Sequence, residues 1–265
     1  LNDDNTKLLV SNWVKDGPVA TISTGSLSID PYHTYTGMQY PHGITSNKAF
    51  DTFFVAASEG NCIYKLTDPS IPGYNSKISL DGDSAVDNSP TDKYGPTQYP
   101  HDLIMAPDYS KYFVTCQQTN EVRVMDAHTD KLLKVIPVGN YPQEFAISYA
   151  PATPYIFVTC MQDSTSGNPP GSKGSVYVIN YNNYRVVKAI YGDFFQPHGI
   201  VVDDRDKTFY VFSRNADGKP THHSTSTNQP DGWYTIYDLN TLKPLINRRY
   251  ELKANPYSAA IRFKN

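Results

Sequence analysis

Short apolar runs alternate with clusters of turn residues along the whole chain. Runs such as 112–116, 122–126 and 133–136 are rich in β-branched and aromatic residues, and turn residues such as Pro107 and Asp108 separate them. Runs of this length and composition are typical of β-strands, and several in close succession indicate antiparallel sheets. The sequence therefore predicts an all-β fold with almost no helix.

One short pattern recurs five times, each time at the start of a group of such runs. The copies are Tyr40-Pro41-His42-Gly43-Ile44, Tyr99-Pro100-His101-Asp102-Leu103, Tyr141-Pro142-Gln143-Glu144-Phe145, Gln196-Pro197-His198-Gly199-Ile200 and Asn255-Pro256-Tyr257-Ser258-Ala259. Their prolines stand 59, 42, 55 and 59 residues apart, which is the length of a propeller blade with its loops. We therefore predict one β-propeller domain over residues 1–265, with about five four-stranded blades.

The two ends of the chain are expected to share a blade. A single apolar run, 259–263, follows the last copy, and the N-terminal run 7–11 aligns with the second strand of the other copies. Pairing of the N-terminal strands with the C-terminal strand would close the ring and remove the open sheet edges.

The order of runs within a repeat resembles a known family. Residues 112–116 (Tyr-Phe-Val-Thr-Cys), the run 122–126 and the segment 134–142 are similar to the YVTN-type β-propeller repeat, with Cys116 and Cys160 where that family carries Asn. The resemblance implies a propeller used as a binding and surface-protein scaffold. It also implies export, to the periplasm or the bacterial cell surface, with a lipid anchor on a segment outside this chain as one form of attachment.

Histidine occupies the same position of the pattern in three copies, as His42, His101 and His198. Ring closure would point equivalent side chains at the mouth of one channel, so three imidazoles are expected to converge. Neutral imidazole suits Cu, Zn or Fe, and an open position beside three such ligands makes a reactive or exchangeable site. Glu144 completes the predicted metal-ligand set. The competing interpretation is that each His caps a backbone group or fills the funnel.

Other residues of the pattern are candidates for the rim of the site or for second-shell contacts. They are Asp102, Gln143, Tyr257, Cys116 and Cys160. The two cysteines end equivalent second strands, where Ala57, Ser213 and Asn12 stand in the other copies, so packing of a small side chain is the favoured interpretation. Thiolate ligation or a disulfide between them is the alternative.

Three long insertions, 81–99, 162–174 and 215–232, are expected on the face that carries the Pro-His turns. A scaffold that lengthens its loops on one face usually works through it, so a protein or small-ligand partner is predicted there. His222 and His223 could add ligands or a lid. Oxygen donors in 81–88 offer a weak Ca²⁺ site that lacks the EF-hand pattern.

Charge and composition narrow the function further. The net charge is −3 and Lys and Arg are scattered, which argues against nucleic acid as a partner. No run approaches the ~18 apolar residues of a membrane span, and no phosphate loop or nucleophile elbow is present.

The preferred function is an exported, non-catalytic binding protein with a His-lined metal site. A metal-dependent hydrolase of the lactonase or glycan-processing type, with Glu144 as general base, is the second hypothesis. The third is a purely structural subunit of a surface complex.

Overall fold

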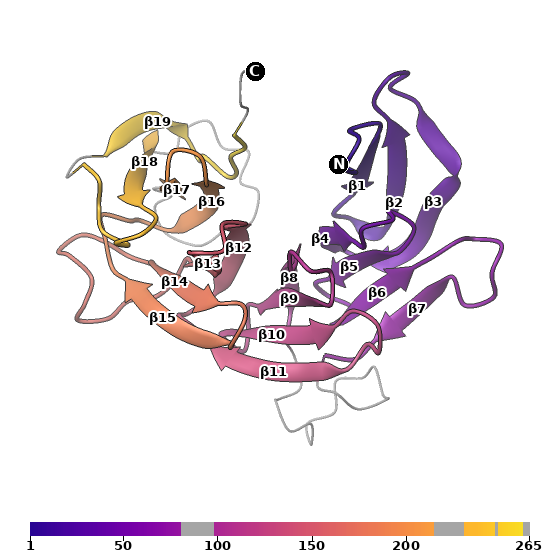
Figure 1. Cartoon of the computed structure of the whole chain (residues 1–265), viewed down its shortest axis with the longest axis horizontal. Coiled ribbons are helices and arrows are strands. Elements are labelled where there is room, and N and C mark those ends of the chain that lie inside the picture. The colour runs from indigo at the N-terminus through magenta and orange to yellow at the C-terminus, as the bar shows by residue number, and fades with distance from the viewer. Residues whose placement is uncertain (81–97, 215–230, 247–248, 262–265) are drawn as a thin grey trace. The chain divides into compact units, whose positions relative to one another are not determined.

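All regular structure in the described part of the chain is β-strand. The structure is a computed structural model that describes residues 1–80, 98–214, 231–246 and 249–261 (Figure 1). This confirms the all-β prediction. The chain divides into two compact units, Leu1–Val135 and Ile136–Asn265. The expectation of a single propeller domain stays a prediction.

The first unit contains three antiparallel sheets, in the strand orders β1-β2-β3, β4-β5-β6-β7 and β11-β10-β9-β8. The strands are β1 (Lys7–Ser11), β2 (Lys15–Ser23), β3 (Ile29–Gln39), β4 (Pro41–Ser46), β5 (Phe53–Ala57), β6 (Cys62–Leu66), β7 (Asn75–Ile78), β8 (Pro100–Met105), β9 (Lys111–Cys116), β10 (Glu121–Asp126) and β11 (Leu132–Pro137). Each sheet is a meander of sequential strands, as a propeller blade is.

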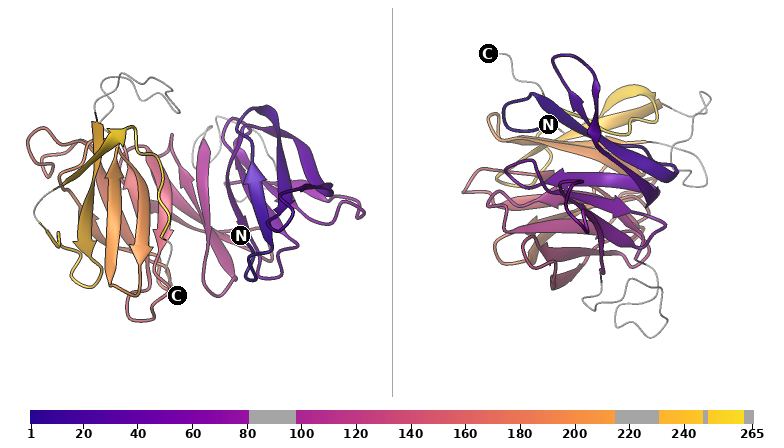
Figure 2. Two further views of the ribbon diagram at one scale, coloured as in Figure 1. Left: turned by 90° about the horizontal axis from the view of Figure 1, so that it is seen from above. Right: turned by 90° about the vertical axis from the view of Figure 1, so that its right-hand side faces the viewer.

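The second unit contains two four-stranded sheets, β12-β13-β14-β15 and β16-β17-β18-β19 (Figure 2). Their strands are β12 (Pro142–Ile147), β13 (Tyr155–Cys160), β14 (Ser175–Asn180), β15 (Arg185–Ile190), β16 (Pro197–Asp203), β17 (Thr208–Ser213), β18 (Asp231–Asp238) and β19 (Tyr250–Ala254). Five antiparallel sheets in the described residues confirm the predicted propeller class and its blade number, but the N-terminal sheet has three strands where four were predicted.

In four of the five copies, the repeat turn starts the inner strand of a sheet and lies beside the end of the second strand. The repeat proline pairs with the last residue of that strand in four copies: Pro41 with Ala57, Pro100 with Cys116, Pro142 with Cys160 and Pro197 with Ser213. A β-bulge follows each of these prolines. The predicted placing of the Pro-His turns beside the ends of the second strands is therefore confirmed.

The residue before each repeat proline has a left-handed backbone in all five copies. Its φ is +53° at Tyr40, +54° at Tyr99, +61° at Tyr141, +55° at Gln196 and +52° at Asn255. Such a conformation costs a non-glycine residue about 1 kcal/mol. A shared hydrogen bond offsets this cost in four copies, because the carbonyl of the left-handed residue accepts the amide of the residue that follows the second strand.

The predicted pairing of the chain ends is wrong in the described residues. β1 pairs with β2, from Lys7 with Ser23 to Ser11 with Val19, in a three-stranded sheet built only from the N-terminal segment. Residues 255–261 form no strand, and the remainder of the expected run, 262–263, lies outside the described residues. A local hairpin can form without closing a long loop, which favours the β1–β2 pair over a pairing across the whole chain.

Neighbouring sheets pack through large apolar side chains of their second strands. In the first unit Phe54 and Tyr112 place their ring centroids 4.5 Å apart, and in the second unit Phe157 and Phe209 place theirs 4.6 Å apart. Phe54 and Phe157 occupy one position of the repeat, Tyr112 and Phe209 occupy the position before it, and all four rings are buried. Such a ring pair stabilises the fold by about 0.5–1.5 kcal/mol beyond the stabilisation that comes from the area it buries.

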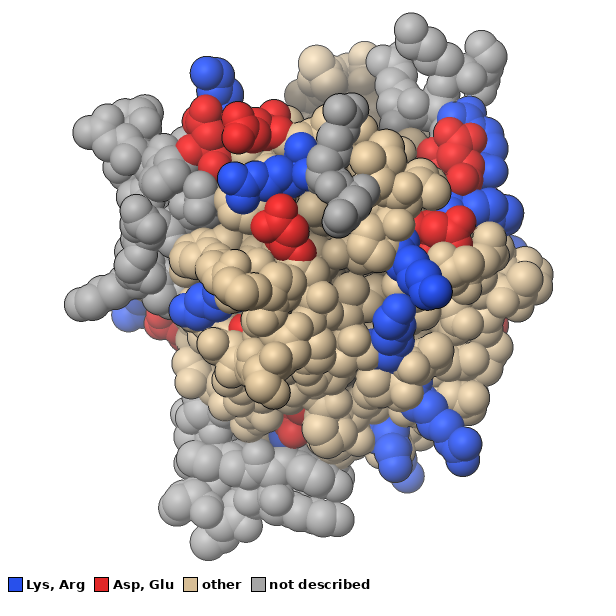
Figure 3. Space-filling model, turned by 90° about the vertical axis from the view of Figure 1, so that its left-hand side faces the viewer, with Lys and Arg blue, Asp and Glu red and all other residues tan. Residues whose placement is uncertain are grey.

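On the face drawn in Figure 3, Lys and Arg are interspersed with Asp and Glu on a largely uncharged surface. Among the described residues, no helix is long and apolar enough to cross a membrane.

Candidate metal centre

Inner strands β4 and β8 of the first unit approach each other very closely. A Cβ atom at Gly43 would lie 2.5 Å from the Cα of Asp102 and 2.7 Å from the carbonyl oxygen of His101. Only glycine fits such an approach. The two strands therefore carry His42 and His101, their second residues, to adjacent positions.

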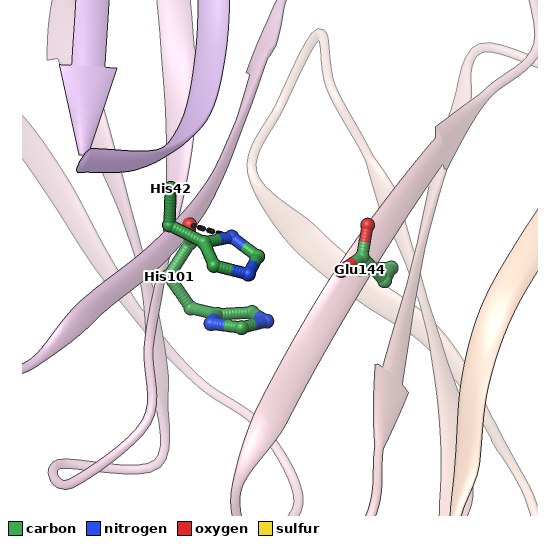
Figure 4. A group of neighbouring side chains, drawn as sticks. All are labelled: His42, His101 and Glu144. Carbon is green, nitrogen blue, oxygen red and sulfur yellow. Dashed lines mark hydrogen bonds between the residues drawn. The ribbon is translucent and has the colours of Figure 1, made fainter. Parts of the chain in front are cut away.

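The imidazoles of His42 and His101 lie stacked (Figure 4). Their ring centroids are 3.9 Å apart and their planes differ by 28°. Nδ1 of His42 donates to the carbonyl oxygen of His101 at 3.1 Å, and a carbonyl can only accept, so Nδ1 carries the proton. In the neutral ring Nε2 then has the lone pair, which is the tautomer that ligates a metal while Nδ1 bonds a backbone carbonyl.

Neighbouring side chains of β1 and its following turn orient His42. The hydroxyl of Ser11 donates to the His42 carbonyl at 2.6 Å, and the Trp13 ring meets the imidazole edge-on at a centroid distance of 6.2 Å. His101 is buried and His42 is half-buried. The pair is thus held in place, and His42 is its more exposed member.

In the second unit His198 makes the same backbone contacts. Its Nδ1 donates to the Tyr257 carbonyl oxygen at 2.9 Å, and its own carbonyl accepts the Thr159 hydroxyl at 2.7 Å. Gly199 again permits the approach, because a Cβ there would lie 2.8 Å from the Cα of Ser258. Because Nδ1 of His198 carries the proton, as in His42, the lone pair of the neutral ring is on Nε2.

Glu144 of β12 lies beside His198 in the same unit. Its Oε1 is 3.8 Å from His198 Nδ1, and burial raises the pKa of Glu144 to about 7. The carboxyl group therefore exchanges its proton near neutral pH. In the first unit, His42 and His101 are two side chains that could hold a metal ion.

The remaining rim candidates have structural partners. Gln143 is fully buried, and its amide donates to the Tyr141 carbonyl at 3.0 Å. Asp102 accepts the amide of Leu103 at 2.8 Å. Tyr257 meets His198 edge-on at a centroid distance of 4.8 Å. These contacts give the three residues positioning roles in their own units.

The cysteines behave as small core residues. Cys62, Cys116 and Cys160 are free thiols with no exposed surface. Burial raises the pKa of Cys116 to about 12 and raises that of Cys160 further, so neither thiolate is accessible near neutral pH. The packing interpretation is supported, and the disulfide alternative does not occur.

Residues that follow the second strands were not predicted as part of the site. Trp13, Met161 and Arg214 occupy this equivalent position. Arg214 is fully buried, its guanidinium lies 4.4 Å from the centroid of the Tyr257 ring, and its Nη1 donates to Met161 Sδ at 3.5 Å. The sequence did contain a signal for these residues, because the repeat alignment places them one residue after the position of Cys116 and Cys160.

Two candidates cannot be placed. The oxygen-rich segment 81–88 and the pair His222 and His223 lie outside the described residues.

No protein-family model matches the chain, and no curated protein matches its sequence. In structure the chain is similar to hydrazine synthase of Kuenenia stuttgartiensis, at 15% identity and a TM-score of 0.68, over 96% of this chain and 64% of that chain. It thus spans less than two thirds of that protein's chain. A functionally unknown protein from Desulfotomaculum acetoxidans is similar at 11% identity and a TM-score of 0.64, over 97% of this chain and 74% of that one. These likenesses show the fold, a propeller-type array of antiparallel sheets.

Proposed function

We propose that this chain is an exported propeller protein of the YVTN repeat type that binds a transition metal ion through His42 and His101. In the second unit, His198 and Glu144 are the further candidate ligands of the proposal, and the loop-rich face is its partner surface. The observation that carries the proposal is the hydrogen bond from His42 Nδ1 to the His101 carbonyl, beside a stacked second imidazole. It fixes the tautomer that offers Nε2 to a metal.

The donor set narrows the metal to Zn, Cu or Fe. Imidazole and carboxylate groups suit these ions, and imidazole disfavours Ca²⁺ and Mg²⁺, which prefer all-oxygen sites. The buried cysteines supply no thiolate, because burial raises the pKa of Cys116 to about 12. The soft ligands that select Cu(I) are therefore lacking at that position.

The experiment is metal analysis of the full chain, purified without a His tag and dialysed against Zn²⁺, Cu²⁺ or Fe²⁺ in turn. We expect one tightly held ion per chain, and its loss in the variant that combines His42→Ala with His101→Ala. His128→Ala removes an exposed imidazole from the β10–β11 turn and is the matched control. Equal metal content in the double variant and the control would refute the proposal. A stoichiometry of two would assign His198 and Glu144 to a separate ion.

A metal-dependent hydrolase is the second candidate, and Glu144 is the observation that favours it. A carboxyl group whose pKa is about 7 is matched to proton transfer at neutral pH, as a general base must be. Lactone and glycoside substrates should be screened with and without a chelator. Chelator-sensitive turnover that Glu144→Gln abolishes would support this candidate, and its absence would leave the binding protein.

A further inference from the structure

A cavity between the two sheets of the second unit lies apart from the metal-centre residues. It has a volume of about 330 Å³ and is bordered by the segment that follows β15, by β18 and by the segment that follows β18. A second cavity of about 270 Å³ shares Tyr191, Tyr237 and Pro244 with it. Tyr191 is thus a wall common to the two cavities, which we call the groove. Small-molecule sites begin at about this size.

At two glycines, tyrosine side chains that line the groove pack closely against the backbone. A Cβ atom at Gly167 would lie 2.9 Å from the Tyr191 ring, and one at Gly192 would lie 2.2 Å from the Tyr237 hydroxyl. Tyr191 therefore packs directly on the backbone at Gly167, and its ring is half-buried. A fixed, half-exposed aromatic face is suited to stacking against the apolar face of a ligand.

Two residues of β18 that carry hydroxyl groups line the first cavity. Thr235 and Tyr237 point to the same side of β18, because side chains two residues apart in a strand share a face. Both residues are buried. Their hydroxyl groups are polar groups that β18 contributes beside the cavity.

A planar carboxylate and a planar guanidinium stand at the rim. The Trp233 indole donates to the Asp193 carbonyl oxygen at 2.8 Å and so anchors the backbone of that residue. The Arg249 guanidinium lies over the Trp233 ring, 4.2 Å from its centroid, with Nη1 3.9 Å from Asp193 Oδ1. Both charged side chains remain partly exposed, so each can turn hydrogen-bonding atoms toward a ligand.

We propose that this groove binds a neutral saccharide of one or two rings. A pyranose has an apolar C–H face, which Tyr191 would stack against, and a hydroxyl edge, which Asp193, Arg249 and Thr235 would bond. The opposite charges of Asp193 and Arg249 compensate each other, so the rim selects neither a cation nor an anion. A groove of this size excludes a folded protein partner.

The test is isothermal titration calorimetry of the full chain with methyl β-glucoside, methyl β-galactoside, cellobiose and chitobiose. We expect at least one of these sugars to bind, and Tyr191→Ala to weaken that binding by about tenfold or more, through the lost stacking face. Tyr149→Ala is the matched control, since it removes a tyrosine that is 64% exposed on another turn. It should change the affinity less than twofold, about the scatter of such a measurement.

A second variant guards against misfolding of the first. Thr235→Val keeps the shape of the side chain and removes only the hydroxyl, and it should weaken the same sugar about threefold to tenfold. Benzyltrimethylammonium is the probe for a cationic ligand. Binding of this cation in place of the sugars, no binding by any of the four sugars, or sugar binding that survives both variants would overturn the proposal.

Discussion

The two units use one backbone contact with different side chains. In the first unit the His42 Nδ1 group donates to the carbonyl of another histidine, whose ring stacks on it. In the second unit His198 donates to the carbonyl of Tyr257, whose ring meets it edge-on and carries the Arg214 guanidinium on its face. The fold thus fixes which nitrogen of the histidine donates the hydrogen bond. The neighbouring side chains differ, and they determine the chemical surroundings of the other ring nitrogen.

Because of this difference, we expect the two units to differ in metal affinity. A stacked imidazole pair offers two neutral nitrogen donors together, which is the start of a metal site. A histidine beside a tyrosine and a buried guanidinium offers one donor next to a cation, and a nearby positive charge disfavours a bound metal ion. We therefore expect the first unit to provide most of the metal affinity.

The largest effect should come from the glycines that let inner strands touch. Gly43→Val should destabilise the protein by about 2–3 kcal/mol, because its Cβ would overlap the backbone of β8. Gly199→Val should cost less, since its neighbour Ser258 belongs to no strand and can move. Urea unfolding measures both. Gly25→Val, with no atom within 4 Å of its Cβ, is the control, and equal losses at Gly43 and Gly199 would contradict the comparison.

The next effect concerns metal affinity. His101→Ala should weaken Zn²⁺ binding about 100-fold, because it removes one ligand of the stacked pair, and His198→Ala, in the other unit, should weaken it less than about tenfold. Competition against a chromophoric chelator gives both constants. A larger loss at His198 would reverse the assignment of the two units.

Glu144 should make stability depend on pH. Because its pKa is about 7 when folded and near 4.5 when unfolded, the folded state holds its proton more tightly. Stability should therefore fall as the pH rises from 4.5 to 7 and stay lower above that. The expected size is about 1–3 kcal/mol. Glu144→Gln should flatten this part of the profile in denaturant titrations; an unchanged profile would show that the carboxyl group is well solvated.

The smallest effect should come from the hydroxyls that bond the histidine carbonyls. Thr159→Val should cost about 1 kcal/mol, because Thr159 is fully buried and His198 loses its hydrogen-bond donor. Ser11→Ala should cost about 0.5 kcal/mol, since Ser11 is only part-buried and water can replace it. Thermal unfolding at fixed pH compares the two. A greater loss at Ser11 would mean that the first unit depends more on this bond.

The repeat made most of the fold predictable. The Pro turns recur with spacings that match a blade, and they mark the start of the inner strand in four of the five described sheets. The pairing of the chain ends was not predictable in the same way, because alignment of 7–11 with a second strand indicates a position and says nothing of the pairing partner. The short connection between β1 and β2 decided that partner.

The site was predictable in its residue types and not in its geometry. One repeat position supplied His42, His101 and His198, and the same alignment also held Trp13 and Arg214 one residue beyond the Cys position. Their importance depends on which ring faces which carbonyl, and that is set by a β-bulge and a glycine approach. Residue spacing does not encode such contacts.

The left-handed residue before each repeat proline has a practical consequence for protein engineering. The turn depends on its backbone angle and on one amide–carbonyl hydrogen bond, so the residue that follows the proline can be exchanged. Gln143→His and Tyr257→His would place imidazoles at the two repeat positions that lack one. The chain therefore allows the number of imidazoles at this repeat position to be varied on a single scaffold, by one substitution or two.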